Sequence, residues 1–278
     1  MKKLLSTLCH KFSTVPVARN STLNDIPRTS CDISRLGSYD QRWLCETFNC
    51  QQIAREWFGD AQRIAALNMP EMTGGVNPGD RRALYHLTRF LRPARVLEIG
   101  THIGSSTVAL ALAAVRNQVD GVETIVETVD VCDVNDELAM PWLQASSPAS
   151  PRALAAALGV DRLLRFEVGA AVDKLASSAD HYDMIFLDGD HSAEAVYREI
   201  PLALQRLSSN NRGIVVLHDY SPGLQALWAG QEPLLGPCQA VERFLSEGAG
   251  FCVLPLGELP WQTKLGSNMT SLAILSKS

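Results

Sequence analysis

The chain has 278 residues, of which 46% are hydrophobic and 20% charged, and its net charge is −5 at pH 7. This length allows one sizeable α/β domain with an extension, and the composition excludes fibrous, collagenous and largely disordered chains. The acidic balance argues against nucleic acid as a partner, because phosphate binding normally needs a basic face.

Cysteines and apolar runs indicate the compartment. The 7 cysteines are scattered and form no C-x-x-C pair, so they indicate neither a zinc site nor a disulfide framework. The start, MKKLLSTLCHKFSTVPVA, is basic, but His10 and Lys11 interrupt its apolar run, which argues against a signal peptide. No stretch approaches the roughly eighteen apolar residues of a spanning helix. We therefore expect a cytoplasmic protein without a membrane partner.

The N-terminal part divides into an irregular and a helical segment. Residues 1–38 are rich in polar residues with little periodicity, and we expect them to be irregular or weakly ordered. Residues 40–68 carry apolar residues at helical spacing, which predicts one or two amphipathic helices. We predict an extension over 1–70, acting as a lid or a homodimer contact, and a second domain over 71–278. For Trp43 and Trp57, core packing is favoured over a ligand role.

From residue 80 onward, helices and strands alternate. A helix over 80–90 ends before Pro93. Strands are predicted at 95–99, 124–130, 163–168, 183–188, 213–218, 251–255 and 270–275. Helices are predicted near 104–116, 152–158, 170–177, 191–208 and 237–247. This alternation predicts an α/β, Rossmann-like doubly wound, mostly parallel seven-stranded sheet covered on both faces. The last two strands are joined by LGELPWQTKLGSN, which lacks a helical pattern and favours an antiparallel edge hairpin.

The segment VLEIGTHIGSSTVALA, residues 96–111, predicts a strand, a glycine turn and a helix. This arrangement places a ligand at a helix N-terminus. A dinucleotide fingerprint would need glycines where His102 and Ser105 stand. A phosphate loop would need a lysine after Gly104, which is absent. What remains is an acidic strand, at Glu98, followed by Gly100 and Gly104.

Five ordered motifs resemble those of class I methyltransferases, which use S-adenosylmethionine. VLEIGTHIGSST is similar to their first motif, ETVDV ends in an acidic residue as their second strand does, and FEVGAAVDKL resembles their turn beside adenine. YDMIFLDGDHSAEAVYREI and GIVVLHDY resemble the fourth and fifth strands of small-molecule O-methyltransferases of the catechol and macrolide-sugar types. The resemblance covers about residues 70–278.

The resemblance implies a set of cofactor-binding residues. Asp130 would accept the ribose hydroxyls, since a carboxylate can make a bidentate, charge-assisted contact. Backbone N–H groups around Thr101 would meet the methionine carboxylate at the helix N-terminus. Glu98 would touch the amino end of the cofactor or hold the turn itself. The full expected set is Glu98, Gly100, Thr101, Gly104, Ser105, Asp130, Gly169, Ala170 and Asp188.

The densest polar cluster, Asp188-Gly189-Asp190-His191, follows an apolar strand. It is therefore expected at the carboxyl end of the sheet, where α/β ligands bind. Methyl transfer to a hydroxyl requires a positioned nucleophile and a group that takes its proton. His191 stands where catechol-type relatives have a lysine base and sugar-type relatives a histidine, and a neutral imidazole suits that role. Asp188, His191 and His218 are the predicted catalytic set.

A divalent metal remains open at this stage. Catechol-type relatives bind one with an acid after the fourth strand and an acidic pair, or an acid–amide pair, after the fifth. Here the second position is His218-Asp219. Asp188 and Asp219 could bind magnesium, while His218 would favour a transition metal. His218 could also be a base or a substrate contact in a metal-free site.

We predict an S-adenosylmethionine-dependent O-methyltransferase acting on a small molecule of secondary metabolism. The main alternative is an S-adenosylmethionine cyclase or lyase on the same fold, in which the cofactor's amine attacks its own γ-carbon. That reaction releases methylthioadenosine, and the cofactor alone is then the substrate. Another group-transfer or hydroxylating relative is also open, because a fold does not fix function. A cofactor-binding module without catalysis is disfavoured by the polar residues at 188–191 and 218–219.

Overall fold

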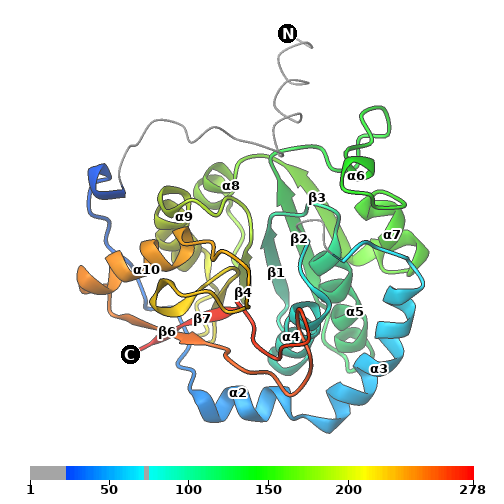
Figure 1. The fold of residues 1–278 in the computed structure, drawn as a ribbon, viewed down its shortest axis with the longest axis horizontal. Coiled ribbons are helices and arrows are strands. Elements are labelled where there is room, and N and C mark those ends of the chain that lie inside the picture. Colours follow the sequence, from blue (N-terminus) through cyan, green and yellow to red (C-terminus); the bar gives the residue numbers. More distant parts are fainter. Residues whose placement is uncertain (1–22, 72–74) are drawn as a thin grey trace.

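A seven-stranded sheet forms the centre of the molecule in the computed structural model, which describes residues 23–71 and 75–278 (Figure 1). The strand order is β3-β2-β1-β4-β5-β7-β6. The strands are β1 (Arg95–Ile99), β2 (Ile125–Asp130), β3 (Leu164–Val168), β4 (Met184–Leu187), β5 (Ile214–Leu217), β6 (Phe251–Pro255) and β7 (Ala273–Lys277). The first five are parallel, and β7 lies antiparallel between β5 and β6. The predicted fold class, with its antiparallel edge pair, is confirmed.

Helices cover both faces of this sheet (Figure 1). One face carries α4 (Pro78–Leu91), α5 (Ser105–Val119) and α7 (Pro151–Ala157), with α2 (Gln41–Phe48) and α3 (Gln51–Ala65) outside them. The other carries α8 (Ala171–Ser177), α9 (Ala193–Arg206) and α10 (Gly236–Ser246). The one-turn α6 (Pro141–Gln144) and the 3₁₀ helices η2 (Leu23–Asp25), η3 (Asp161–Leu163) and η4 (Pro222–Leu224) were not predicted.

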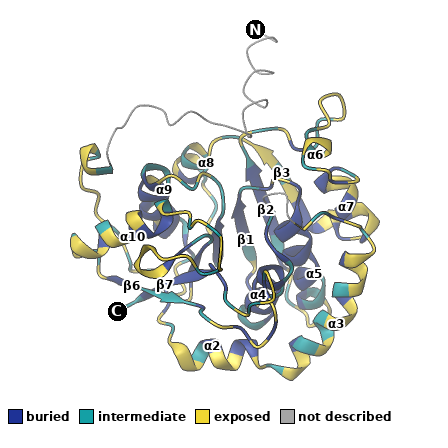
Figure 2. Ribbon diagram, viewed as in Figure 1, coloured by how far each residue is buried: buried dark blue, intermediate teal, exposed yellow. Residues whose placement is uncertain are grey.

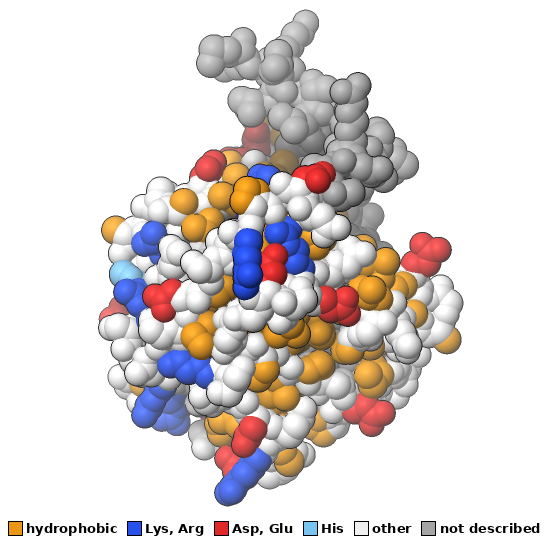
Figure 3. All heavy atoms as spheres, turned by 90° about the vertical axis from the view of Figure 1, so that its left-hand side faces the viewer, with side chains coloured by type: hydrophobic (Ala, Val, Ile, Leu, Met, Phe, Trp, Pro, Cys, Tyr) orange, Lys and Arg blue, Asp and Glu red, His pale blue; other side chains and the backbone are white. Residues whose placement is uncertain are grey.

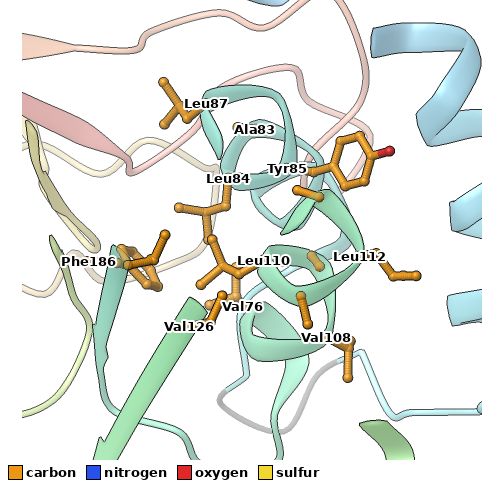
Figure 4. Packing of buried hydrophobic residues seen from close by; sticks show 14 of the residues in the cluster. Val76, Ala83, Leu84, Tyr85, Leu87, Val108, Leu110, Leu112, Val126 and Phe186 are labelled. Atoms are coloured by element: carbon orange, nitrogen blue, oxygen red, sulfur yellow. The ribbon is translucent and has the colours of Figure 1, made fainter. Parts of the chain in front are cut away.

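Alternate strand residues enter two separate cores, because successive side chains of a strand point to opposite faces. Val96, Val126 and Phe186 pack with α4 and α5, as Figure 4 shows for Val126 and Phe186. Leu97 and Ile185 pack with α9 and α10. The central strands β1, β4 and β5 are buried on both sides, whereas the edge strand β3 is partly exposed and the outer helices expose their far faces (Figure 2). This explains why the strands read as continuous apolar runs.

The helical extension is part of the first core. Leu44 and Phe48 of α2 and Ile53 and Ile64 of α3 belong to the same buried cluster as α4. The rings of Trp57 and Tyr85 lie 5.1 Å apart, and those of Trp43 and Phe90 lie 5.8 Å apart. Core packing of both tryptophans is confirmed. A lid or homodimer role for residues 1–70 stays a prediction.

The segment over 23–38 is irregular but held to the domain. Leu36 is fully buried in the second core and forms an isolated β-bridge with Gly213. The Gly37 N–H donates to the Gly213 carbonyl at 2.8 Å. The segment has no helix or strand beyond η2 and this bridge, so the expected irregular structure is confirmed. It is nevertheless held to the domain by one buried leucine and a few backbone hydrogen bonds. Residues 1–22, with the stretch tested as a signal peptide, lie outside the described residues.

The described helices were compared with the length and apolarity that a membrane-spanning helix needs. In the described ranges, every helix is too short or too polar to cross a bilayer. Figure 3 shows the face that carries α10 and β6, where basic and acidic side chains are interspersed with hydrophobic ones. That face has no broad field of one sign of charge.

The turn after β1 passes close to the chain that leaves β4. Gly100 has a φ of +94°, and a Cβ atom there would lie 2.1 Å from the Asp188 carbonyl oxygen. The left-handed region penalises any side chain, and the backbone carbonyl cannot move aside cheaply. Only glycine fits this crossing.

We expect Gly100→Ala to lower the free energy of unfolding much more than Gly121→Ala. Gly121 has a similar φ of +82°, but nothing lies within 4 Å of its added Cβ. Gly121→Ala, the control, should lower the free energy of unfolding by about 1 kcal/mol because of its backbone conformation. Gly100→Ala should lower it by at least about 2 kcal/mol more because of the clash. Urea unfolding of both variants measures this, and equal losses would contradict the crossing.

Candidate functional site

The carboxyl ends of β1, β2, β4 and β5 gather the predicted site residues at one edge of the sheet. The glycine turn follows β1, Asp130 ends β2, and Asp188 follows β4. His218 and Asp219 follow β5 directly. Because the strands are parallel, these loops meet at the same edge, where ligands of α/β folds bind.

The Asp130 carboxylate holds the glycine turn. Its Oδ2 accepts hydrogen bonds from the N–H groups of Thr101 at 3.1 Å and His102 at 2.9 Å, and its Oδ1 accepts from Cys132 at 3.0 Å. An ionised carboxylate offers about four acceptor sites. The backbone therefore occupies most of them, and about one site is left for the predicted contact with ribose.

The first turn of α5 forms the other wall of the glycine turn. Gly104 caps the helix with a φ of +79°, and a Cβ atom there would lie 2.9 Å from the Pro151 Cβ. The Ser105 hydroxyl is buried and has no hydrogen-bond partner among the described residues. A helix N-terminus with free donors favours an anion. These atoms fit the carboxylate expected there.

Glu98 lies beneath the turn rather than beside it. It is fully buried, and its Oε2 accepts from the hydroxyls of Thr107 at 2.5 Å and Thr128 at 2.6 Å. The Thr101 hydroxyl lies 2.6 Å from that of Thr128, which links Glu98 to the turn. Of its two predicted roles, these contacts favour holding the turn. Burial raises the pKa of Glu98 to about 7.

Gly169 and Ala170, predicted beside adenine, lie where β3 ends. The Gly169 N–H donates to the Asp130 carbonyl at 2.9 Å, and Ala170 is the N-cap of α8. Space is open around Gly169, since nothing lies within 4 Å of an added Cβ. Both residues therefore adjoin Asp130, and their contact with adenine stays a prediction.

Two histidines and the aspartates form a connected cluster. His218 Nδ1 lies 2.7 Å from Asp188 Oδ1 and 3.5 Å from Asp219 Oδ2. His191 Nδ1 also lies 3.5 Å from Asp219 Oδ2. The His218 side chain is 11% exposed and that of His191 is 35% exposed. His191 is thus the histidine that an outside molecule can reach.

A third carboxylate, from Asp80, completes the cluster and was missed from the sequence. Asp80 is fully buried in the first turn of α4, and its Oδ2 lies 3.4 Å from His218 Nε2. Asn77 and Thr270 donate to its two oxygens at 2.6 and 2.5 Å. In the sequence, N-P-G-D indicates only a helix start. No local signal connects Asp80 to a residue after β5.

The charges of this cluster explain the titration of its members. Burial disfavours the imidazolium of His218, but Asp188 and Asp219 outweigh burial and raise its pKa well above the usual value. Burial likewise opposes ionisation of Asp219, yet His218 holds the pKa of that carboxyl well below its usual range. His218 therefore carries a proton, and it cannot take another from a substrate.

Asp188, His218 and Asp219 could together hold a metal ion, since their donor atoms all lie within 4.8 Å of one another. Asp219 has a φ of +53°, a strained conformation that often marks functional positions. A metal would have to displace the His218 proton, because only the neutral imidazole binds it. Two carboxylates and one imidazole suit a transition metal better than magnesium.

We expect the buried Glu98 to make stability fall as the pH rises. An acid whose pKa is raised on folding, here from 4.5 to about 7, favours the folded state while it is protonated. The stabilisation is present at low pH and is lost across this interval, by about 3 kcal/mol. Urea unfolding at about pH 5 and pH 8 measures it. Glu98→Gln should reduce the dependence by this amount, while the part due to the raised pKa values of Glu199 and His218 remains. The exposed Glu123→Gln should keep the full dependence, and an unchanged slope in Glu98→Gln would contradict the prediction.

We expect a transition-metal ion to stabilise the fold through the cluster. Saturating Mn²⁺ or Zn²⁺ should raise the melting temperature by about 5 °C, and Mg²⁺ should raise it less. Asp188→Asn should abolish the increase, whereas Asp190→Asn, in the same loop but outside the donor set, should retain it. No increase with any of these ions would exclude this metal site.

Comparison with known proteins agrees with this geometry. Residues 97–220 match the family model described as "Methyltransferase domain". No curated protein sequence matches the chain significantly.

Several solved structures share the fold at low sequence identity. Cofactor-bound Rv0187 from MTB is 19% identical, covers 80% of this chain and 89% of its own, and has a TM-score of 0.53. The O-methyltransferase TomG from Streptomyces achromogenes, in complex with SAM, is 18% identical, with coverages of 88% and 93% and a TM-score of 0.52. The O-methyltransferase from Bacillus cereus, in complex with SAH, is 17% identical, with coverages of 80% and 91% and a TM-score of 0.51.

The family match covers β1, β2, β4 and β5 with the loops that carry the polar cluster, and the solved structures confirm the sheet around them. Residues 97–220 of this chain match a methyltransferase domain, and the solved structures show that the surrounding chain has the same fold as these proteins.

Proposed function

We propose that this protein transfers a methyl group from S-adenosylmethionine to an oxygen atom of a small molecule. The observation that carries the proposal is the contact between the glycine turn and the polar cluster. Gly100 lies against the Asp188 carbonyl, so a cofactor bound at the turn would have its reactive end beside Asp188 and its neighbours. Binding and chemistry would then share one edge of the sheet.

The residues around the turn fit the cofactor. The N-terminus of α5, with the unpartnered Ser105 hydroxyl, suits the methionine carboxylate. The remaining acceptor site of Asp130 suits a ribose hydroxyl, and the open space at Gly169 suits the base. When bound, S-adenosylmethionine supplies a methyl group on a positively charged sulfonium. The protein then has to orient the acceptor and take its proton.

His191 is the proposed base. It is the reachable histidine of the cluster, and the carboxylate of Asp219, 3.5 Å from its Nδ1, would stabilise the positive charge that proton uptake creates. His218 is proposed as a fixed charge that holds Asp188 and Asp219 in place, because its proton makes it unfit as a base. Asp188 would position the acceptor.

The class of acceptor is supported by the relatives. TomG is described as involved in tomaymycin synthesis, and both TomG and the Bacillus cereus protein are described as O-methyltransferases. At this low sequence identity the structural likeness shows the fold alone, and the acceptor is our proposal. We propose a small hydroxylated molecule of secondary metabolism. No contact in the described chain favours the cyclase reaction over transfer.

We expect the purified protein to leave S-adenosylmethionine intact when no acceptor is present. Adding a panel of small hydroxylated compounds, with catechol as the first probe, should yield S-adenosylhomocysteine and a product heavier by one methylene, both measured by mass spectrometry. Methylthioadenosine formed without an acceptor would overturn methyl transfer in favour of cyclisation or lysis.

We expect His191→Ala to lower kcat by about 10²-fold or more, because the transition state loses its proton acceptor. The Kd for S-adenosylmethionine, measured by calorimetry, should change little, since His191 does not contact the glycine turn. His181→Ala, which removes an exposed histidine, is the matched control. Unchanged turnover in His191→Ala would remove this residue from the mechanism.

A further inference from the structure

A second pocket lies between α3 and the first turn of α4, and the mechanism above does not use it. Its volume is about 440 Å³, which falls in the range of small-molecule sites. Its apolar walls include Trp57 and Ile64 of α3 and Met69 from the segment that follows this helix. Ile64 and Met69 are buried, whereas Glu71 at the rim is exposed. A pocket of this size can enclose an organic molecule of one or two rings.

A buried cation lines this pocket. Arg81 belongs to the first turn of α4 and is 5% exposed. Its Nε has no hydrogen-bond partner, and no ion pair reaches its guanidinium within the described part of the chain. Burial lowers the pKa of Arg81, and the charge of Glu71 opposes this effect only in part. An arginine nevertheless keeps its charge, and a buried charge is costly unless it is paired. The unpaired guanidinium therefore indicates that an anion binds beside it.

The walls of the pocket favour one kind of anion. The planar fork of a guanidinium binds a carboxylate through two parallel hydrogen bonds. Glu71 lines the same pocket and would repel a multiply charged anion such as phosphate. The Trp57 ring, which also packs against Tyr85 at 5.1 Å, offers a flat apolar surface that suits an aromatic ring. The lining therefore suits a singly charged carboxylate with a flat, apolar body.

The first turn of α4 separates this pocket from the polar cluster. Pro78 and Arg81 both line the pocket, since residues three apart lie on the same face of a helix. Asp80 lies on another face, where its Oδ2 is 3.4 Å from His218 Nε2. Among the described residues, those that line the pocket include none of the cluster and none of the predicted cofactor set. A ligand bound here would therefore occupy a site of its own.

We propose that this pocket binds a small aromatic monocarboxylic acid, whose carboxylate pairs with Arg81 and whose ring packs against Trp57 and Met69. The ligand would supply the negative charge that the fold does not place beside Arg81. Ala61 and Ala65 of α3 also line the pocket, and their small side chains leave room for the ring. The inference goes beyond the proposed methyl transfer and does not depend on it, because the two sites have no residue in common.

Calorimetry with naphthoate as the probe tests this site. We expect naphthoate to bind the wild type, and its neutral amide, naphthamide, to bind at least about tenfold more weakly because the charge-assisted hydrogen bonds are lost. Arg81→Gln should weaken naphthoate binding by at least about tenfold for the same reason. Arg82→Gln is the matched control and should bind as the wild type does. Arg82 is the next residue of the same helix, but its guanidinium carbon lies 4.0 Å from the centre of the Trp261 ring, outside the pocket.

Two further measurements separate lost binding from a damaged fold. The melting temperature of Arg81→Gln should not fall, since the substitution removes an unpaired buried charge. Ala61→Trp should abolish naphthoate binding while Arg81 stays in place, because the larger ring fills the pocket from α3. Saturating S-adenosylmethionine should leave the affinity for naphthoate unchanged.

Equal naphthoate affinities in the wild type and Arg81→Gln would overturn the proposal, as would the absence of binding up to about 1 mM naphthoate. Inorganic phosphate that binds more tightly than naphthoate would overturn the assigned class of ligand. Competition between naphthoate and S-adenosylmethionine would place the probe at the glycine turn and exclude a separate site.

Discussion

One close backbone crossing determines the geometry of the candidate site. The Asp188 carbonyl oxygen occupies the space that any side chain at residue 100 would need. The glycine turn after β1 therefore lies directly against the chain that leaves β4. The van der Waals contact between Gly100 and the Asp188 carbonyl sets the spacing between the glycine turn and the polar cluster. The buried Glu98 and its two threonine partners support the same turn from below. The glycine turn and the loop after β4 are thus held together by a backbone contact.

Around this crossing the polar groups are arranged by depth. Asp80 and His218 lie deepest, and their opposite charges allow both to be buried, since an unpaired buried charge would be costly. The Asp188 side chain is exposed to the same extent as that of His218, Asp219 lies nearer the surface, and His191 is more exposed than these three. The inner groups carry fixed charge and position the outer ones. In the proposed function, this division assigns proton transfer to His191, the more exposed of the two histidines.

Glu199 extends the same arrangement into α9. A helix that covers the sheet also supplies a polar group to the back of the site, through a cavity just large enough for a water. The face of α9 that packs on the sheet is otherwise apolar, with Val196, Ile200 and Ala203 in the second core.

The sequence by itself determined the local elements of the site. These are continuous apolar strands, a glycine turn that fits neither a dinucleotide nor a phosphate loop, and polar residues directly after β4 and β5. These features are local, so spacing and residue type reveal them. Only the tertiary structure decided that Asp80 joins the polar cluster and that Glu199 lies behind it. The same holds for the contacts by which Asp130 and Glu98 hold the glycine turn, and for the order of residues 23–38. Asp80 lies close to His218 and Thr270, which are far from it in the sequence, and Leu36 pairs with Gly213, just before β5. Such contacts depend on packing between distant segments, and no local pattern encodes them.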